Sequence, residues 1–426
     1  MGPIPSLLSF LDASPTAWHA VEQIEHRLLQ KKFLALDART TWSLEAGKRY
    51  FFGNGGALVA FVVPYRKPVG GTLFASHTDS PALKIKPQSQ VVKAGTLLLG
   101  VEVYGAPLLT SWFNRDLGIA GKIVGVNTKG ETETHTVFFT DAPLVIPQLA
   151  IHLDRDVNEK GLIINKQEQL YAIAGLEKDF ASSQNYLEKI FEKELNGQKL
   201  LNFELFLVPL EKAKLVGWQQ QLLASYRIDS LVSVHAILEA FLSQLDPWGD
   251  QIKMVVFWNH EEIGSTGVFG AASPFLPRIL ERLCLALGIS REEYLAFLDC
   301  SRCISVDLGH AVHPTYPEKH EAQHPLFFKQ GVVIKSHAQM RYATDVFSAS
   351  WIEAAAYVKQ LPLQKFAGRN DIPCGSTVGP IVATSCGIPT VDIGIPQLSM
   401  HSARELMCCQ DYVDLTCLLS HLLETM

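Results

Sequence analysis

Five short apolar runs constrain this sequence more than any other feature, because they contain almost no charged residues. They lie at 57–63, 71–76, 254–258, 304–306 and 390–393. Strands that lack a polar face are typical of a sheet that is covered on both sides. Since segments with helical periodicity separate the later runs, we expect an α/β fold in which a mixed sheet is flanked by helices.

The apolar spacing between the runs predicts individual helices. Apolar residues recur at a helical period from Leu231 to Leu245, and Asp246-Pro247 ends the pattern. We expect a second helix at 351–358. Near the beginning of the chain, Ser14-Pro15 has the chemistry of a helix start, with serine as the cap and proline in the first turn.

The middle of the chain has a different pattern. The segments 97–104, 119–126 and 135–140 resemble antiparallel strands, and Asn127-Thr128-Lys129-Gly130 has turn chemistry. A chain of 426 residues also exceeds the size at which one hydrophobic core usually stops growing. We therefore expect a discontinuous first domain formed by 1–90 and 222–426, and an inserted β-rich domain for dimerisation or assembly at 91–221.

Composition argues against several classes of partner. The formal net charge of −6 and the pI near 6.2 give no general attraction for nucleic acid or for an anionic membrane. The first residues lack a basic segment followed by an apolar core, and no apolar run approaches the ~18–20 residues that span a bilayer. We expect a cytoplasmic protein with no nucleic-acid and no membrane partner.

Residues that can bind metal or transfer protons follow the apolar runs. The residues are His77 and Asp79 after the second run, Glu261 and Glu262 after the third, Asp307 after the fourth, and His401 after the fifth, with Asp229 at the start of the helix near 231. Open α/β sheets bind ligands at the carboxyl ends of their strands, so we expect these side chains to converge.

The charges of these side chains suit a pair of zinc ions. Three carboxylates, those of Asp229, Glu262 and Asp307, together with one hydroxide would balance four positive charges, and His77 and His401 would add neutral nitrogen ligands.

Glu261 would then be placed to take a proton from water and pass it to a leaving amine. Asp79 would orient the imidazole of His77.

Each residue also has a structural explanation when it is taken alone. Glu261-Glu262 can be a solvated acidic turn, and His77 with Asp79 can satisfy a polar turn. Asp229 and Asp307 can be caps, and His401 can be an ordinary buried histidine. The residues alone leave these alternatives open, although all of them would have to hold at once.

The motifs around these residues closely resemble the M18 metallopeptidase family, the aspartyl aminopeptidases, over nearly the whole chain. The matching segments are Ser76 to Pro81, Trp112 to Leu117, Ile146 to Leu153, Asn259 to Ser265, Asp307 to Pro314, Arg369 to Thr377 and Pro396 to Ser402.

This resemblance implies a discontinuous zinc-peptidase domain with an inserted β-rich domain. It implies two zinc ions per subunit, with cobalt or manganese as alternatives. His77 and Asp307 would hold one ion, Glu262 and His401 the other, and Asp229 would bridge them.

The resemblance also assigns roles beyond the metal ligands. Glu261 would be the general base, and Lys335 would face a substrate carboxylate. His152 would reach a neighbouring subunit's active site within a tetrahedral dodecamer. His310 and His313 are treated as structural.

The function implied is removal of an N-terminal Asp or Glu from peptides by metal-activated water. One alternative is a broad-specificity metallo-amidohydrolase, and another is a catalytically silent assembly protein of the same fold.

The sequence departs from the family pattern at Asn114, Gln148 and Ser230. We nevertheless predict a cis peptide bond between Asp229 and Ser230.

Overall fold

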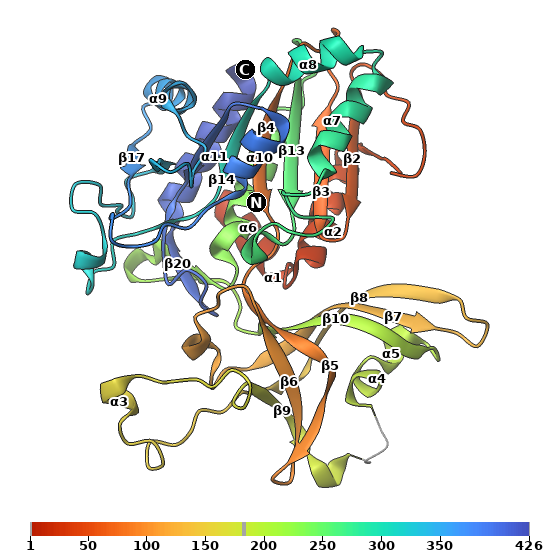
Figure 1. Cartoon of the computed structure of the whole chain (residues 1–426), viewed down its shortest axis with the longest axis vertical. Coiled ribbons are helices and arrows are strands. Elements are labelled where there is room, and N and C mark those ends of the chain that lie inside the picture. The colour runs from red at the N-terminus through yellow and green to blue at the C-terminus, as the bar shows by residue number, and fades with distance from the viewer. Residues whose placement is uncertain (1, 181–184, 426) are drawn as a thin grey trace. The chain divides into compact units, whose positions relative to one another are not determined.

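The computed structural model describes residues 2–180 and 185–425 (Figure 1). The chain divides into two compact units. The first contains residues 1–79, 213–400 and 405–426, and the second contains 80–212 and 401–404. The boundaries lie about ten residues before those expected from the sequence. The reason is that β5 (Ala82–Lys93), the first strand of the second unit, begins only five residues after β4 (Gly70–His77) ends.

A nine-stranded mixed sheet forms the centre of the first unit. Its order is β1-β2-β3-β13-β4-β14-β18-β16-β17. The bounds are β1 Leu34–Ala35, β2 Arg49–Asn54, β3 Ala57–Val62, β13 Gln251–Trp258, β4 Gly70–His77, β14 Arg302–Val306, β18 Thr390–Gly394, β16 Val332–Lys335 and β17 Leu363–Phe366. The four central strands β13, β4, β14 and β18 are parallel, whereas β3 and β16 are antiparallel to their neighbours β13 and β18. Five of these strands contain the predicted apolar runs.

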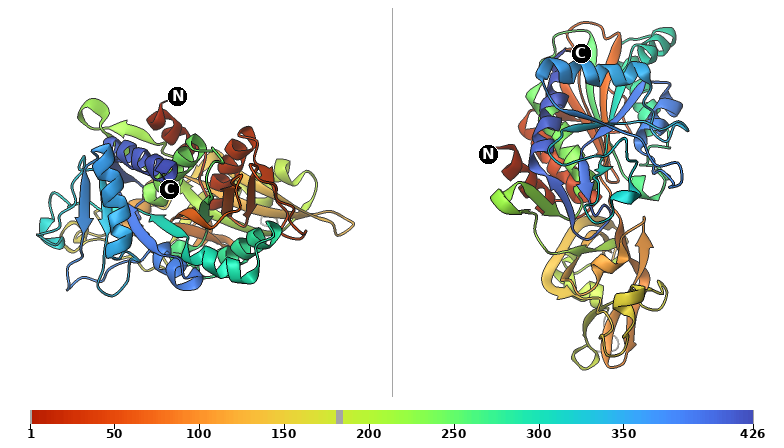
Figure 2. Two further views of the ribbon diagram at one scale, coloured as in Figure 1. Left: turned by 90° about the horizontal axis from the view of Figure 1, so that it is seen from above. Right: turned by 90° about the vertical axis from the view of Figure 1, so that its left-hand side faces the viewer.

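Helices cover the sheet on both faces, as Figures 1 and 2 show. Neighbouring residues of β4 demonstrate the two layers, because Phe74 belongs to one apolar core while Leu73 and Ala75 belong to the other. The first core contains α1 Pro3–Asp12, α2 Ala17–Gln30, α6 Ile228–Ser243, α9 Val346–Lys359 and α11 Cys409–Thr425; the second contains α7 Phe275–Ala286, α8 Arg291–Asp299 and α10 Val378–Cys386. The predicted α/β class is confirmed.

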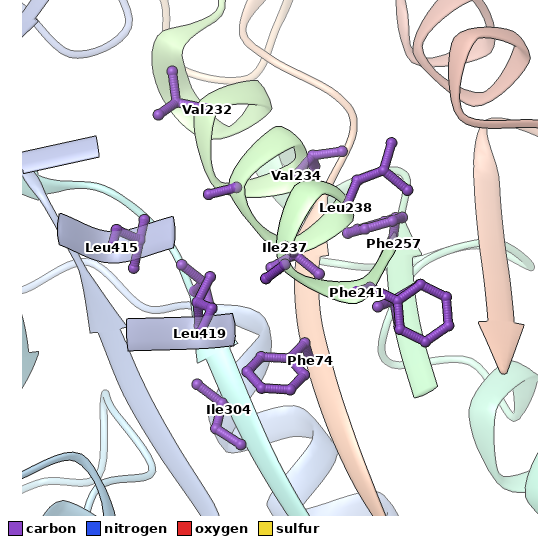
Figure 3. Close-up of a cluster of buried hydrophobic side chains, with 14 of the residues drawn as sticks. Phe74, Val232, Val234, Ile237, Leu238, Phe241, Phe257, Ile304, Leu415 and Leu419 are labelled. Atoms are coloured by element: carbon purple, nitrogen blue, oxygen red, sulfur yellow. The ribbon is translucent and has the colours of Figure 1, made fainter. Parts of the chain in front are cut away.

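The helix α6 lies at the centre of the first core. Its residues Ile237 and Phe241 lie in one cluster with Phe74 of β4 and Leu419 of α11 (Figure 3). Since almost every residue of α6 is buried, its apolar residues occupy all sides rather than one stripe. This burial holds the beginning of α6, where Asp229 lies, against the sheet.

A small separate sheet also lies in the first unit, beside the beginning of α6. Its order is β11-β12-β20-β19-β15, with bounds β11 Lys214–Val216, β12 Leu222–Ser225, β20 Glu405–Cys408, β19 Pro396–Leu398 and β15 Gly309–His310. Ser225 of β12 is opposite Glu405 of β20. The pairing therefore brings Glu405 next to the chain that enters α6.

The second unit is built on a six-stranded antiparallel sheet of order β8-β7-β10-β5-β6-β9. The bounds are β5 Ala82–Lys93, β6 Thr96–Tyr104, β7 Leu117–Val126, β8 Thr132–Leu144, β9 Tyr171–Leu176 and β10 Lys199–Pro209. Short helices accompany it at α3 Val157–Lys160, α4 Tyr186–Ile190 and α5 Glu192–Leu195. Among the described residues of both units, no helix is long and apolar enough to cross a membrane.

Candidate metal centre

The parallel strands bring three polar turns to one edge of the sheet. Trp258, the last residue of β13, is opposite His77, the last residue of β4. The pairing continues into the turns, because the backbone N–H of Thr78 donates to the carbonyl oxygen of Trp258 at 2.7 Å. Ser305 of β14 is opposite Ala75 of β4, so Asp307 follows at the same edge.

His77 lies within ion-coordinating range of two carboxylates. Its Nε2 atom is 3.4 Å from Oδ1 of Asp229 and 3.5 Å from Oδ1 of Asp307. Ligand atoms of His77, Asp229 and Glu262 all lie within 4.8 Å of one another. Two ligand atoms bound tetrahedrally to one zinc at ~2.1 Å are ~3.4 Å apart. The nitrogen and oxygen donors present therefore fit zinc in both type and spacing.

The charges around His77 are strongly coupled. Burial opposes protonation of His77, but its hydrogen bonds to Asp229, Asp307 and Asp79 raise its pKa well above the usual value. Burial raises the pKa of Glu262 well above its usual value, and the neighbouring Asp229 raises it further. Burial likewise raises the pKa of Glu261 to about 8, with Asp307 and Asp79 adding to the effect. Without a cation, the repulsion between these carboxylates favours their protonation. A bound divalent ion would offset this repulsion.

Asp79 holds the turn that contains the two glutamates, in addition to its contact with His77. Its Oδ1 atom accepts the backbone N–H of Glu261 at 3.1 Å, and its Oδ2 atom accepts that of Glu262 at 3.1 Å. Oδ1 is also 3.5 Å from Nδ1 of His77. One buried carboxylate therefore fixes the histidine and the short helix η4 (Glu261–Ile263) together.

The peptide bond between Asp229 and Ser230 is cis, which confirms the prediction. The backbone N–H of Asp229 donates to Oε2 of Glu405 at 3.0 Å. Arg227 adopts a left-handed backbone conformation with φ of 64°, and its buried guanidinium donates to the carbonyl oxygens of Thr78 and Ser14. Arg227 thus connects the turn of His77 to the turn of Asp229.

Comparisons with known proteins match nearly the whole chain to one family. A sequence model described as "Aminopeptidase I zinc metalloprotease (M18)" matches residues 10–422. A "Probable M18 family aminopeptidase 2" of Pseudomonas savastanoi is 39% identical over 423 residues, covering 97% of this chain and 96% of that protein. The chain belongs to the M18 family. It is accordingly a zinc metallo-aminopeptidase, a hydrolase.

Two solved structures show the family fold. The chain of the Ape4 and Nbr1 complex studied by cryo-EM has a TM-score of 0.94 at 33% identity, with 99% of this chain and 85% of that chain covered. The Saccharomyces mApe1 dodecamer has a TM-score of 0.84 at 24% identity, with 99% and 96% covered. At that lower identity the likeness establishes the fold alone.

Lys335 lies directly beside the carboxylate cluster of this M18 enzyme. Only 2% of the residue is exposed, and its Nζ atom donates to the carbonyl oxygen of Leu308 at 2.6 Å. Nζ is also 3.4 Å from Oδ2 of Asp307 and 5.4 Å from the ring centre of Tyr342. Although burial opposes ionisation of Asp307, the charges of Lys335 and His77 hold its pKa below the usual value. Lys335 therefore offsets part of the negative charge at the site.

Two predicted site residues belong to the second unit. His152 is exposed in a turn between β8 and β9. His401 has a φ of 66°, and its Nδ1 atom is 3.2 Å from the carbonyl oxygen of Ala106. The roles of both histidines in the metal centre stay predictions.

Asn114 and Gln148, at which the sequence departs from the family pattern, contact each other in the second unit. The side-chain oxygen of Asn114 accepts the backbone N–H of Gln148 at 3.0 Å, and Asn114 itself has a φ of 57°. Asparagine tolerates this left-handed conformation well. Asn114 therefore fixes the start of the segment that leads to His152.

Sequence reasoning missed Arg227, Glu405 and Tyr342 as neighbours of the centre. Arg227 is adjacent to the predicted ligand segment, so its position was a usable signal. Glu405 comes from a strand 176 residues further along the chain. Tyr342 lies outside all of the segments that match the family motifs.

Proposed function

We propose that this M18 enzyme is a di-zinc aminopeptidase that removes an N-terminal Asp or Glu from peptides. The observation that carries the proposal is the gathering of His77, Asp229, Glu262 and Asp307 at one edge of the sheet. A tetrahedral zinc with one open position needs three protein ligands. The four side chains here, one imidazole and three carboxylates, are more than that, which favours two ions.

His77 and Asp307 would hold one zinc, Glu262 and His401 the other, and Asp229 would bridge the two. The ions would supply Lewis acidity and a water of lowered pKa. Cobalt or manganese are alternatives, since both accept the same nitrogen and oxygen donors.

Glu261 would act as the general base. Glu261 directly precedes Glu262 in the chain, and its backbone N–H donates to Asp79. Glu261 would accept a proton from the attacking water and return it to the amine that leaves. The bound ions would lower the pKa of Glu261 from the raised value of the metal-free cluster, which would keep it ionised at neutral pH.

The preference for an acidic residue would come from Lys335. An ammonium group in a nearly dry environment attracts a carboxylate strongly, because water does not screen it. Its present partners are the Leu308 carbonyl oxygen and Asp307. Engagement with a substrate carboxylate would place a third oxygen at the same Nζ, which has three donor hydrogens.

Assembly into a homo-oligomer in the cytoplasm is part of the proposal. The solved structure of Saccharomyces mApe1, which has the same fold, is that of a dodecamer. The family resemblance implies that the assembly is a tetrahedral dodecamer. In it, His152 would reach the active site of a neighbouring copy and stabilise the oxyanion. Its exposed turn in the second unit is compatible with this role.

The experiment compares hydrolysis of Asp-, Glu-, Leu- and Lys-anilides by the zinc-loaded enzyme and by Glu261→Gln. We expect aspartate and glutamate to be preferred, and a loss of ~10²–10⁴-fold in kcat for the variant at unchanged zinc content. Faster turnover of leucine than of aspartate would refute the acidic preference. Equal activity of the two proteins would remove Glu261 from the mechanism.

A further inference from the structure

The helix α9 (Val346–Lys359) exposes a continuous uncharged stripe. The exposed fractions are 76% for Val346, 74% for Phe347, 86% for Tyr357 and 65% for Val358. Ser350 and Ala354 are exposed between these pairs. At 100° per residue the six positions span about 120° of the helix surface. Such a stripe is wide enough to serve as a packing face.

The opposite side of α9 is already buried. Ile352 and Ala356 belong to the first apolar core, and the helix packs there against α11. A helix that is apolar on both sides is normally covered on both sides. In the right-hand view of Figure 2, none of the described elements is drawn over α9. Its outer face therefore has the properties of an interface that is open in the isolated chain.

The order of side-chain sizes along the stripe is symmetric. Bulky pairs lie at each end, at 346–347 and 357–358, and the small residues Ser350 and Ala354 lie between them. Small residues allow two crossing helices to approach closely, and bulky residues fill the space where the helices diverge. The Ser350 hydroxyl donates to the carbonyl oxygen of Phe347 at 2.6 Å, so its polarity is satisfied within its own helix.

Charges lie outside the stripe. Glu353 borders it and is paired with Lys365 of β17 at 2.7 Å. A face without charge favours an equally uncharged partner, and a second copy of the same face offers one. In an antiparallel pair of identical helices, Phe347 would be opposite Tyr357 of the partner, and Ser350 opposite Ala354.

We propose that α9 packs antiparallel against α9 of a second copy across a two-fold axis. Phe347 and Tyr357 would together bury on the order of 300 Å² per copy. A standard interface buries roughly 800 Å² per partner, so this contact would be one part of a larger interface. The inference rests on the proposed homo-oligomer and names one of its contacts.

The test measures the mass of the zinc-loaded full-length protein by light scattering over a range of concentrations. Phe347→Glu should reduce the mass at least two-fold. The helix should persist in this variant, because glutamate in the first turn suits the helix dipole. The matched control is Leu285→Glu on α7, where the leucine is 62% exposed. The control should leave the mass unchanged.

Two double variants test the antiparallel arrangement. Phe347→Glu with Tyr357→Lys should recover assembly, because the glutamate of each copy would be opposite the lysine of the other. Phe347→Glu with Tyr357→Glu should dissociate at least as far as the single variant. Circular dichroism would verify the fold of each variant.

The outcomes separate the two proposals. A monomeric wild-type protein would contradict the proposed homo-oligomer itself. A wild-type oligomer that Phe347→Glu leaves intact would overturn only the contact through α9. Dissociation by Phe347→Glu without recovery by the Tyr357→Lys partner change would overturn the antiparallel arrangement.

Discussion

Replacing Asp79 with asparagine should weaken zinc binding through the residues that Asp79 holds. The carboxylate of Asp79 accepts the backbone N–H groups of Glu261 and Glu262, both at 3.1 Å. Asparagine retains one acceptor oxygen and places an NH₂ group against the second N–H. The change removes one of the two charge-assisted hydrogen bonds and makes the other neutral. The loss should therefore be at least the ~1.5–3 kcal/mol that one such bond contributes to the free energy of unfolding.

The effect on zinc should be separable from this loss of stability. Changing an outer partner of a metal ligand typically costs 10–100-fold in metal affinity, or about 1.4–2.7 kcal/mol. We expect Asp79→Asn to lose zinc affinity in this range, and kcat to fall because Glu261 is less well placed. Competition with a chromophoric chelator measures the affinity, and urea unfolding measures the stability.

Asp411 provides a matched control for Asp79. It is fully buried, and its carboxylate accepts two backbone N–H groups, from Lys329 at 2.9 Å and from Gly331 at 2.8 Å. Asp411→Asn should lose comparable stability without any change in zinc affinity. If Asp79→Asn binds zinc as tightly as the wild type while both variants lose similar stability, Asp79 has only a structural role and the reasoning fails.

Three further predictions concern the surroundings of the centre. Arg227→Met removes the guanidinium hydrogen bonds to Ser14 and Thr78 and should lower both the Tm and the zinc affinity. Arg227→Lys should recover part of both. A lower Tm at unchanged zinc affinity would contradict a positioning role for Arg227. Burial lowers the pKa of His235 from 6.5 to about 3, and the positive charge of Arg27 adds to the effect. The stability that His235 contributes is therefore present above pH 6.5 and is lost as the pH falls, by about 2 kcal/mol between pH 7 and pH 5. In urea unfolding, the stability of His235→Gln should decline less than that of the wild type by this amount. An equal decline in both proteins would refute this assignment. Removing the metal with EDTA should lower the Tm and abolish activity. Adding zinc at ~1,000 times its Kd should restore about 4 kcal/mol of the free energy of unfolding. A Tm that EDTA does not change would argue against a zinc site in the folded chain.

The sequence predicted most of the elements whose signal is local. The helix start expected at Ser14-Pro15 was wrong, because α2 begins at Ala17 with Thr16 in the cap position. The apolar runs at 57–63 and 254–258 are strands β3 and β13, because strands covered on both faces need no polar residues. The helix expected at 351–358 is α9, which begins earlier, at Val346. Its start is set by a capping box between Asp345 and Ser348 that apolar periodicity does not record.

The contacts that hold the centre depend on tertiary register and could not be predicted in this way. The bonds from Asp79 to Glu261 and Glu262 require β4 and β13 to be adjacent and in a particular alignment. Lys335 was expected to face a substrate, and the structure adds its contact with Asp307. This contact arises because β14 and β16 both pair with β18, where Val306 and Ile334 are opposite the same residue, Ile393. The gathering of His77 with Glu262 and Asp307 was predictable, since strand ends of a parallel sheet meet at one edge. Asp229 joins them from the beginning of α6.

The most direct test of a paired zinc centre is an anomalous-scattering map, recorded at the zinc edge from crystals of the zinc-loaded protein. We predict two peaks ~3.5–4 Å apart with the carboxylate of Asp229 between them. A single peak, or peaks away from Asp229, would contradict the di-zinc mechanism.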